Sequence, residues 1–172
     1  MNMNLFSWFV PTEQPHTNAI PLYIELIEAE RFDMVFPLLK KLAARNDALA
    51  MTCLGSLYAM GKGCTKDPVE AAVWFRQAAN GGNINAQTAL GCCLATGNGV
   101  PLDLSEAAYW LYRGGKGGSL VAVEVLGKLA FDNPSIIGEH FTDAELATLV
   151  VESRRKAFAK MGREYPSGEM LH

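Results

Sequence analysis

The sequence is poor in the residues that bind metals or form disulfides. It contains four cysteines and three histidines among 172 residues, and His16, His140 and His172 are far apart along the chain. It has no CxxC pair, whereas a zinc site needs Cys and His ligands that cluster. We therefore expect no metal site and no cofactor, and free, mostly buried thiols in place of disulfides.

Long hydrophobic runs and an excess of positive charge are also missing. The first apolar stretch, residues 5–10, ends at Pro11 and has no Lys or Arg before it. No run approaches the roughly 20 apolar residues that a transmembrane helix needs. Fifteen Lys and Arg against eighteen Asp and Glu give a net charge of -3, so no strong field attracts polyanions. These absences predict a cytoplasmic protein that binds neither a membrane nor nucleic acid.

A hydrophobic core and an internal repeat are what the sequence does contain. Hydrophobic residues make up 49% of the chain, which is enough for one domain over residues 1–172. Residues 48–83 and 84–119 align without a gap at a shift of 36, and fourteen of the 36 aligned positions are identical. The identical pairs include Gly61 and Gly97, Gly63 and Gly99, Asp67 and Asp103, and Trp74 and Trp110. A repeat of this length is typical of solenoid proteins.

Each repeat unit has the pattern of two helices joined by a turn. Ala50, Leu54 and Leu57 recur at helical spacing over residues 48–60. Gly61 supplies the left-handed conformation that ends this helix, and Asp67 is a good N-cap for the next one. One helical hairpin cannot bury both of its faces, so the units must stack on one another. The sequence therefore predicts an all-α solenoid of stacked helix-turn-helix repeats.

The repeated residues resemble the Sel-1-like repeat family, a branch of the tetratricopeptide-like helical repeats. The resemblance is carried by LGSLYAMGKGCTKDPVEAAVWFRQAANGG and LGCCLATGNGVPLDLSEAAYWLYRGGKGG. It implies the same α-solenoid fold. The chain departs from the family pattern at Cys64, Leu94, Gly114 and Gly115. Because glycine is a poor helix former, the two glycines predict a second-repeat helix that is either frayed or closely packed at its end.

The segments that flank the repeats have the pattern of helical caps. Ala122, Leu126 and Gly127 are third copies of repeat positions, and Thr142 with Glu145 forms a capping-box pattern. Leu22 is expected on the apolar side of the N-terminal cap. The expected segments are an N-terminal helical cap (1–47), a partial third repeat (120–133), a C-terminal capping helix (134–161) and a loose tail (162–172).

The resemblance to tetratricopeptide geometry also implies a binding surface. In stacked helical hairpins the first helices line a concave groove, and the side chains there are free to contact a partner. Met60 and Thr96 are expected at its rim. The groove positions that the resemblance implies are Leu49, Thr52, Ser56, Ala59, Asn85, Thr88, Cys92, Ala95, Val121, Glu124, Lys128 and Phe131.

By the same resemblance, the function expected is non-enzymatic binding of a single protein partner. Small members of the family resemble immunity proteins, so the most concrete version is an inhibitor that neutralises a cognate bacterial toxin. The alternative within this class is a general adaptor or scaffold in signalling or complex assembly. We expect a monomer or a weak homodimer. A structural homo-oligomer, in which the segment NLFSWFV (residues 4–10) docks on a neighbouring chain, is a third interpretation.

A different class of function remains open at the N-terminus and at one turn. Glu25, Glu28, Glu30 and Asp33 form a possible acidic patch for a basic partner, and with His16 or Cys64 they are candidates for a small-ligand site or an enzyme. Cys64 lies in the turn GKGCTKD, where lysines would favour a reactive thiol. Its counterpart in the second repeat is Val100, which favours an apolar filler and no catalysis. The repeated Trp74 and Trp110 are expected to pack in the core.

Overall fold

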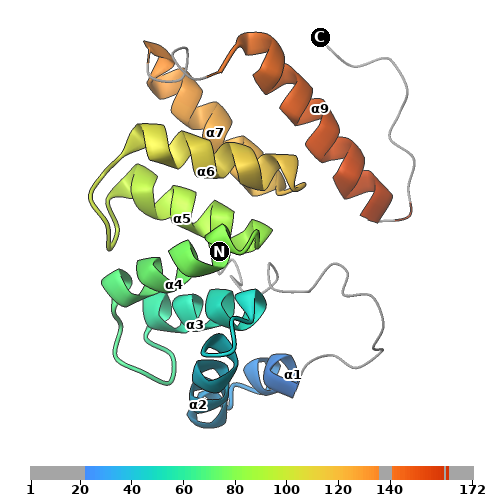
Figure 1. Ribbon diagram of the computed structural model, residues 1–172. Coiled ribbons are helices and arrows are strands. Elements are labelled where there is room, and N and C mark those ends of the chain that lie inside the picture. The colour runs from blue at the N-terminus through green and yellow to red at the C-terminus, as the bar shows by residue number, and fades with distance from the viewer. Residues whose placement is uncertain (1–21, 136–140, 161, 163–172) are drawn as a thin grey trace.

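The computed structural model describes residues 22–135, 141–160 and 162, and every regular element among them is an α-helix. Figure 1 shows the helices stacked in chain order, from α1 and α2 at one end to α7 and α9 at the other. The all-α solenoid is confirmed. The helices are α1 (Leu22–Glu28), α2 (Phe32–Ala43), α3 (Ala48–Met60), α4 (Pro68–Asn80), α5 (Ile84–Thr96), α6 (Leu104–Lys116), α7 (Leu120–Asp132) and α9 (Asp143–Lys160).

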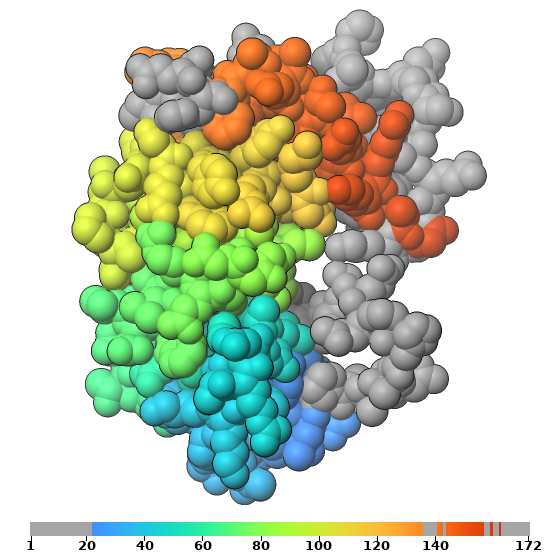
Figure 2. All heavy atoms as spheres, viewed as in Figure 1, coloured from blue at the N-terminus to red at the C-terminus, as the bar shows by residue number. Residues whose placement is uncertain are grey.

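Several expectations fall on residues outside this description. The apolar stretch 5–10, His16, His140 and residues 163–172 of the expected tail all lie outside the described residues. Within the described part, the space-filling view shows neighbouring helices packed directly on one another along the stack (Figure 2).

The two repeats fold in the same way because the same residues begin and end their helices. The four helices α3, α4, α5 and α6 each have 13 residues. Gly61 and Gly97 end the first helix of each pair with φ of 70° and 67°, a conformation that glycine adopts without strain. Asp67 and Asp103 cap the second helix by accepting hydrogen bonds from backbone amides in its first turn. The local sequence therefore determines the structure of each helical hairpin, and successive hairpins stack on one another.

The turn between paired helices is tied back to the first helix. The Asp67 amide donates to the Tyr58 carbonyl at 2.9 Å, and the Asp103 amide donates to the Leu94 carbonyl at 3.1 Å. Gly99 brings its turn against the preceding repeat, because a Cβ there would lie 2.0 Å from the Pro68 carbonyl oxygen. The turns therefore help to set the spacing of neighbouring hairpins.

The core runs the length of the stack. Leu54, Leu90, Leu111 and Leu126 are almost fully buried in one continuous cluster. Gly55 lets the two helices of the first repeat approach closely, since a Cβ there would lie 2.8 Å from the Phe75 ring. The Phe75 ring occupies the space that a side chain at residue 55 would need, and this ring also lines the surface described below.

The glycines that replace the paired alanines of α6 are closely packed. Gly114 and Gly115 are buried within the helix. A Cβ at Gly114 would lie 2.9 Å from the Thr88 hydroxyl oxygen, and one at Gly115 would lie 3.2 Å from Leu149 on α9. Of the two outcomes that the sequence left open, close packing is the one observed. The missing methyl group of Gly115 leaves room for Leu149 of α9, and that of Gly114 leaves room for Thr88 of α5 and Ala122 of α7.

The flanking helices close the two ends of the described stack. At the N-terminal end α1 buries Tyr23, Ile24 and Ile27, whereas Leu22 is 61% exposed. The expectation for Leu22 is therefore wrong: it is the first residue of a short helix, and most of its side chain is exposed. At the other end α9 contacts both α6 and α7.

The N-terminus of α9 is capped as its sequence predicts. The Thr142 amide donates to the Glu145 carboxylate at 2.8 Å, and the Glu145 amide donates to the Thr142 hydroxyl at 3.2 Å. These two hydrogen bonds are the reciprocal pair of a capping box. They satisfy backbone donors that the first helical turn leaves without partners.

Candidate partner-binding groove

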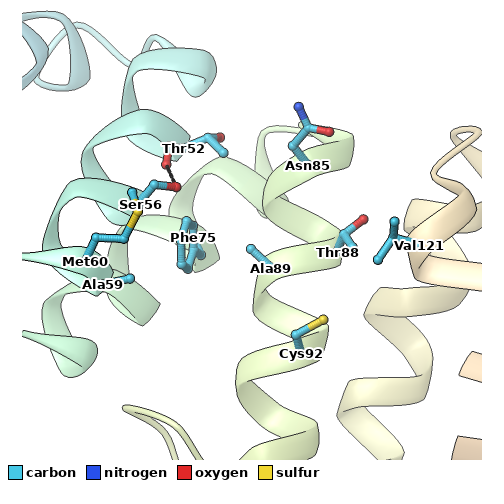
Figure 3. A pocket seen from close by; sticks show the side chains of 10 residues that line it. All are labelled: Thr52, Ser56, Ala59, Met60, Phe75, Asn85, Thr88, Ala89, Cys92 and Val121. Atoms are coloured by element: carbon cyan, nitrogen blue, oxygen red, sulfur yellow. Dashed lines mark hydrogen bonds between the residues drawn. The ribbon is translucent and has the colours of Figure 1, made fainter. Parts of the chain in front are cut away.

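An apolar hollow opens between the first helices of the two repeats. It has a volume of about 260 Å³ and is formed by α3 and α5, with one residue of α4 and one of α7. Figure 3 shows the Phe75 ring of α4 lying between α3 and α5, with Thr88 and Val121 pointing toward one another at the α7 side. The lining residues are Thr52, Ser56, Ala59, Met60, Phe75, Asn85, Thr88, Ala89, Cys92 and Val121.

Seven of the twelve groove positions that the sequence suggested lie together around this hollow. They are Thr52, Ser56, Ala59, Asn85, Thr88, Cys92 and Val121. Leu49 and Ala95 are half-buried beside it, and Glu124, Lys128 and Phe131 are exposed on α7, away from the lining. Of the two expected rim residues, Met60 lines the hollow and Thr96 does not. That these residues bind a partner stays a prediction.

Sequence reasoning missed two residues of the hollow, Phe75 and Ala89. Phe75 has the pattern of a core residue and is indeed 5% exposed, yet one side of its ring forms part of the lining. The available signal was Gly55, because a glycine facing α4 allows the ring to reach toward the α3 surface. Ala89 is half-buried on α5, one position after Thr88.

The hydroxyl groups of the lining are turned to their own helices. The Thr52 hydroxyl donates to the Ala48 carbonyl at 2.7 Å, and the Ser56 hydroxyl donates to the Thr52 carbonyl at 3.1 Å. The Thr88 hydroxyl lies 3.0 Å from the Ile84 carbonyl and 3.0 Å from the Ser119 hydroxyl. Their carbon atoms therefore face the hollow, and its lining is almost wholly apolar. Such a surface favours an apolar group over a charged or phosphorylated one.

The cysteine of the hollow is not an activated nucleophile. Burial raises the pKa of the Cys92 thiol above its ordinary value, so the thiol is protonated at neutral pH. Its neighbour Cys93 has a pKa raised to about 11, again chiefly by burial. Among the described residues, no group of three or more His, Cys, Asp and Glu is arranged to hold a metal ion.

Cys64 has an environment that opposes reactivity. Burial raises its pKa, and the Asp67 carboxylate raises it further, while Lys40 acts in the opposite direction. The lysine beside it, Lys62, lies with its ammonium group 4.9 Å from the centre of the Phe32 ring. The Cys64 sulfur lies 3.6 Å from the Leu57 carbonyl, within the turn. The contacts of Cys64 fit a turn filler.

The N-terminal acidic residues lie at the surface of α1 and the start of α2. Glu25, Glu28, Glu30 and Asp33 are all exposed. Arg31 stands among them, and its guanidinium Nε lies 3.4 Å from the Asp33 carboxylate. This pair reduces the negative charge of the patch, and an exposed ion pair of this kind contributes little to stability. His16, the base considered with these acids, lies outside the described residues.

A second hollow, of about 300 Å³, lies between the end of α6 and α9. Tyr112, Lys116, Glu145 and Glu152 line it together with smaller side chains. Hydrogen bonds from Thr142 lower the pKa of Glu145, which shows that this carboxylate serves the helix cap. Among the described pockets, this is the place where several titratable groups meet.

The two repeated tryptophans differ in their hydrogen bonding. Trp110 is buried, and its indole N–H donates to the Glu106 carboxylate at 3.0 Å. Arg76 from the preceding repeat forms a two-pronged ion pair with the same carboxylate. The Trp74 indole N–H is buried and has no hydrogen-bond partner in the structure. Trp110 belongs to the buried core cluster, and the half-buried Trp74 packs against that cluster.

A comparison with protein families decides which fold family this is. The family model of the Sel1 repeat matches residues 48–83 and 84–119, the same two units that align in the sequence. Residues 48–83 and 84–119 are therefore Sel1 repeats. Sel1 repeats indicate a protein-protein interaction module.

Solved structures of Sel1-like repeat proteins share the fold. A Sel1 repeat protein from Oxalobacter formigenes aligns with a TM-score of 0.65 and 23% identity, over 81% of this chain and 56% of its own. The protective antigen c5321 of uropathogenic Escherichia coli aligns with a TM-score of 0.60 and 23% identity, over 88% of this chain and 33% of its own. The chain therefore spans only part of the length of these two proteins.

A third similar solved structure is shorter than this chain. The Helicobacter pylori cysteine rich protein B aligns with a TM-score of 0.52 and 22% identity, over 61% of this chain and 97% of its own. No curated protein matches the sequence significantly. Within the described residues, no helix combines the length and apolar character needed to cross a bilayer.

Proposed function

We propose that this Sel1-like repeat protein is a non-enzymatic binding protein that holds a segment of one protein partner in the groove of its first helices. The observation that carries the proposal is the apolar hollow between α3 and α5. By resemblance to other helical-repeat proteins, the first helices line the concave face that such proteins use for binding. We define the groove by the residues that line this hollow.

The size and chemistry of the hollow favour a side chain over a free small molecule. Its volume of about 260 Å³ lies below the roughly 300–1,000 Å³ typical of small-ligand pockets. The hydroxyls of Thr52 and Ser56 already have backbone acceptors, so few polar groups remain to orient a small ligand. An apolar side chain presented by a helix or an extended segment gains affinity from burial alone, as interface anchors do.

In its most specific form, the proposal names the partner as a bacterial toxin that this protein neutralises. That form rests on the resemblance of small Sel1-like chains to immunity proteins. The broader form, an adaptor in signalling or complex assembly, uses the same groove. Only the toxin form predicts that a strain without this protein is harmed when the partner is present, and one experiment separates the two forms. A strain that lacks this protein should be harmed by the product of a neighbouring toxin gene, and an unharmed strain would end the toxin version.

The groove itself is tested by filling it. Ala89→Leu adds three carbon atoms at a half-buried lining position, and we expect it to weaken binding of the partner by at least about tenfold, because the anchor no longer fits. Ala147→Leu makes the same chemical change at an exposed position on α9 and should leave the affinity unchanged. Equal affinities for the wild type and both variants, measured by calorimetry, would contradict a role for the groove.

A second candidate function follows from the hollow beside α9. If the protein binds a small ligand, this hollow favours it more than the exposed N-terminal acids do, because Tyr112, Lys116 and Glu152 face one space. Lys116→Ala should then abolish binding of an anionic ligand while the partner still binds in the groove. An anionic ligand that binds the variant as well as the wild type would exclude this site.

A further inference from the structure

The last helix of the groove differs from the two before it. On α7, the residues Val121, Glu124, Lys128 and Phe131 occupy the positions that carry small or uncharged side chains on α3 and α5. At about 100° per residue they fall within an arc of about 80° on one side of the helix. Glu124, Lys128 and Phe131 are exposed. We call these four residues the α7 seam.

Phe131 stands out within the seam. Its side chain is 87% exposed, more than any other large hydrophobic residue described. The equivalent positions on α3 and α5 are Ala59 and Ala95, so an aromatic residue at this position is not part of the repeat pattern. A phenylalanine left in water loses the free energy of burial that it would gain at an interface. At the other end of the seam, Val121 lines the apolar hollow.

Two copies of the α7 seam that run in opposite directions place complementary residues opposite one another. The order of the four residues is symmetric in position about residue 126, with the apolar pair outside and the oppositely charged pair inside. Their spacing of three, four and three residues is that of a coiled-coil seam. When two such helices pack antiparallel about a twofold axis, each Glu124 meets Lys128 of the other copy, and each Val121 meets Phe131 of the other copy.

We propose that a second copy of this chain docks on the α7 seam and forms a twofold-symmetric homodimer. Phe131 of each copy packs against Val121 of the other, at the edge of the apolar hollow. Two symmetric Glu124–Lys128 pairs fix the register and the antiparallel direction. Each interface of a closed dimer is made by the same patch on both chains, and a sequence that matches its own reverse satisfies this condition.

The charges on the seam support this occupant in particular. Glu124 and Lys128 are four residues apart on α7, yet no ion pair within 4 Å joins them among the described residues. Both groups are therefore available to a partner of opposite charge. A second copy supplies those charges in matching order, and charge pairs of this kind set partner choice and orientation. A foreign segment in the same place would need the same alternation by chance.

The dimer is expected to be weak. Four side chains from each chain bury far less than the roughly 1,200–2,000 Å² of a stable interface. Association should therefore appear only as the concentration rises. Because Val121 belongs to both surfaces, the dimer and the partner-bound form compete for one edge of the groove. This inference does not depend on who the partner is, and it survives if the groove binds nothing else.

Charge reversal on the full chain tests the register. In sedimentation velocity from about 1 μM to about 1 mM, the wild type should shift from monomer toward dimer with concentration. Glu124→Lys and Lys128→Glu each place like charges opposite one another twice, and each should weaken dimerisation at least about tenfold. The double variant carrying both changes restores opposite pairs and should restore dimerisation. This rescue separates the proposed contact from a general effect on folding.

A second variant tests the apolar end of the seam. Phe131→Ala should weaken dimerisation at least about tenfold, and the charge swap should not rescue it. Glu28→Lys changes the net charge as Glu124→Lys does, on the exposed surface of α1, and should leave dimerisation unaltered. A wild-type chain that stays monomeric throughout the range overturns the proposal. So does dimerisation that persists in both single charge reversals, which would indicate another surface.

Discussion

At the scale of single residues, three aligned glycines have different surroundings. A Cβ at Gly55 or Gly91 would lie 2.8 Å from the Phe75 ring or 2.7 Å from Leu111. A Cβ at Gly127, the third copy on α7, would meet no atom of the described residues within 4 Å. The first two positions are therefore held by packing between paired helices. Gly127 retains the residue type of the repeat without the contact that explains it.

This contrast predicts opposite effects of one substitution. Gly127→Ala should raise the free energy of unfolding by about 0.5–1 kcal/mol, because alanine is the better helix former. Gly91→Ala should lower it by about 1–3 kcal/mol, because Leu111 must shift to admit the methyl group. Chemical denaturation of the two variants compares them directly. If both substitutions are destabilising to the same degree, the explanation from packing is wrong.

A carboxylate between the repeats makes stability depend on pH. Its hydrogen bond with Arg76, aided by one from Trp110, holds the pKa of Glu106 below its ordinary value of 4.5. A lowered pKa in the folded chain means that Glu106 stabilises the fold above about pH 4.5. That contribution is lost as the pH falls through the lower, folded-state pKa.

Glu106→Gln tests this linkage. At neutral pH the variant should melt at a lower temperature than the wild type, and the gap should shrink as the pH falls below 4.5. Arg76→Gln removes the main cause of the lowered pKa of Glu106. The gap in melting temperature between this variant and the wild type should also shrink as the pH falls below 4.5. A gap in melting temperature that stays constant from neutral pH to pH 3 would contradict the account.

At the scale of elements, the turns hold neighbouring hairpins together. Gly99 has a φ of 76°, and a Cβ there would lie 2.0 Å from the Pro68 carbonyl oxygen of the preceding repeat. Gly82 has a similar φ of 84°, but a Cβ there would meet nothing within 4 Å. Both glycines have a left-handed backbone, but only Gly99 lies against the preceding repeat. Comparing substitutions at the two positions therefore distinguishes the cost of backbone strain from the cost of losing this contact.

We expect Gly99→Ala to be clearly more destabilising than Gly82→Ala. Both changes strain a left-handed backbone, at about 1–2 kcal/mol, but only the first also forces the turn away from α4. The difference between their free energies of unfolding measures the contact between turn and hairpin. If the two values are equal, the turn does not contribute to stacking.

The elements that local sequence determines could be predicted, and those that tertiary packing determines could not. Asp67, Asp103, Gly61 and Gly97 mark helix ends through contacts with their own neighbours in sequence, so the repeats and their helices were predictable. The exposure of Leu22 depends on how α1 packs against α2, and no local sequence pattern encodes that packing.

The candidate site was predictable to a similar extent. Repeat geometry placed seven lining residues on one face, because equivalent positions of stacked helices face the same way. The Phe75 ring entered the lining because Gly55 leaves space beside it, and that contact between two helices appears only in the fold. The seam of α7 needed the exposures of Glu124, Lys128 and Phe131 as well as their order.

At the scale of the whole molecule, the described stack presents an apolar hollow between the first helices of its two repeats. We propose that a protein partner occupies the hollow between α3 and α5. Two half-buried cysteines, Cys92 in the hollow and Cys64 in a turn, allow this claim to be tested without changing the sequence. Mass spectrometry can follow alkylation of each thiol separately.

The decisive measurement is the rate of alkylation of Cys92 with and without the bound partner, with Cys64 as the internal control. Both thiols have raised pKa values, so the reaction is followed at mildly alkaline pH. The account predicts that the partner slows alkylation of Cys92 at least about tenfold and leaves Cys64 unchanged. A saturating partner that leaves the Cys92 rate unchanged would contradict the assignment of the groove.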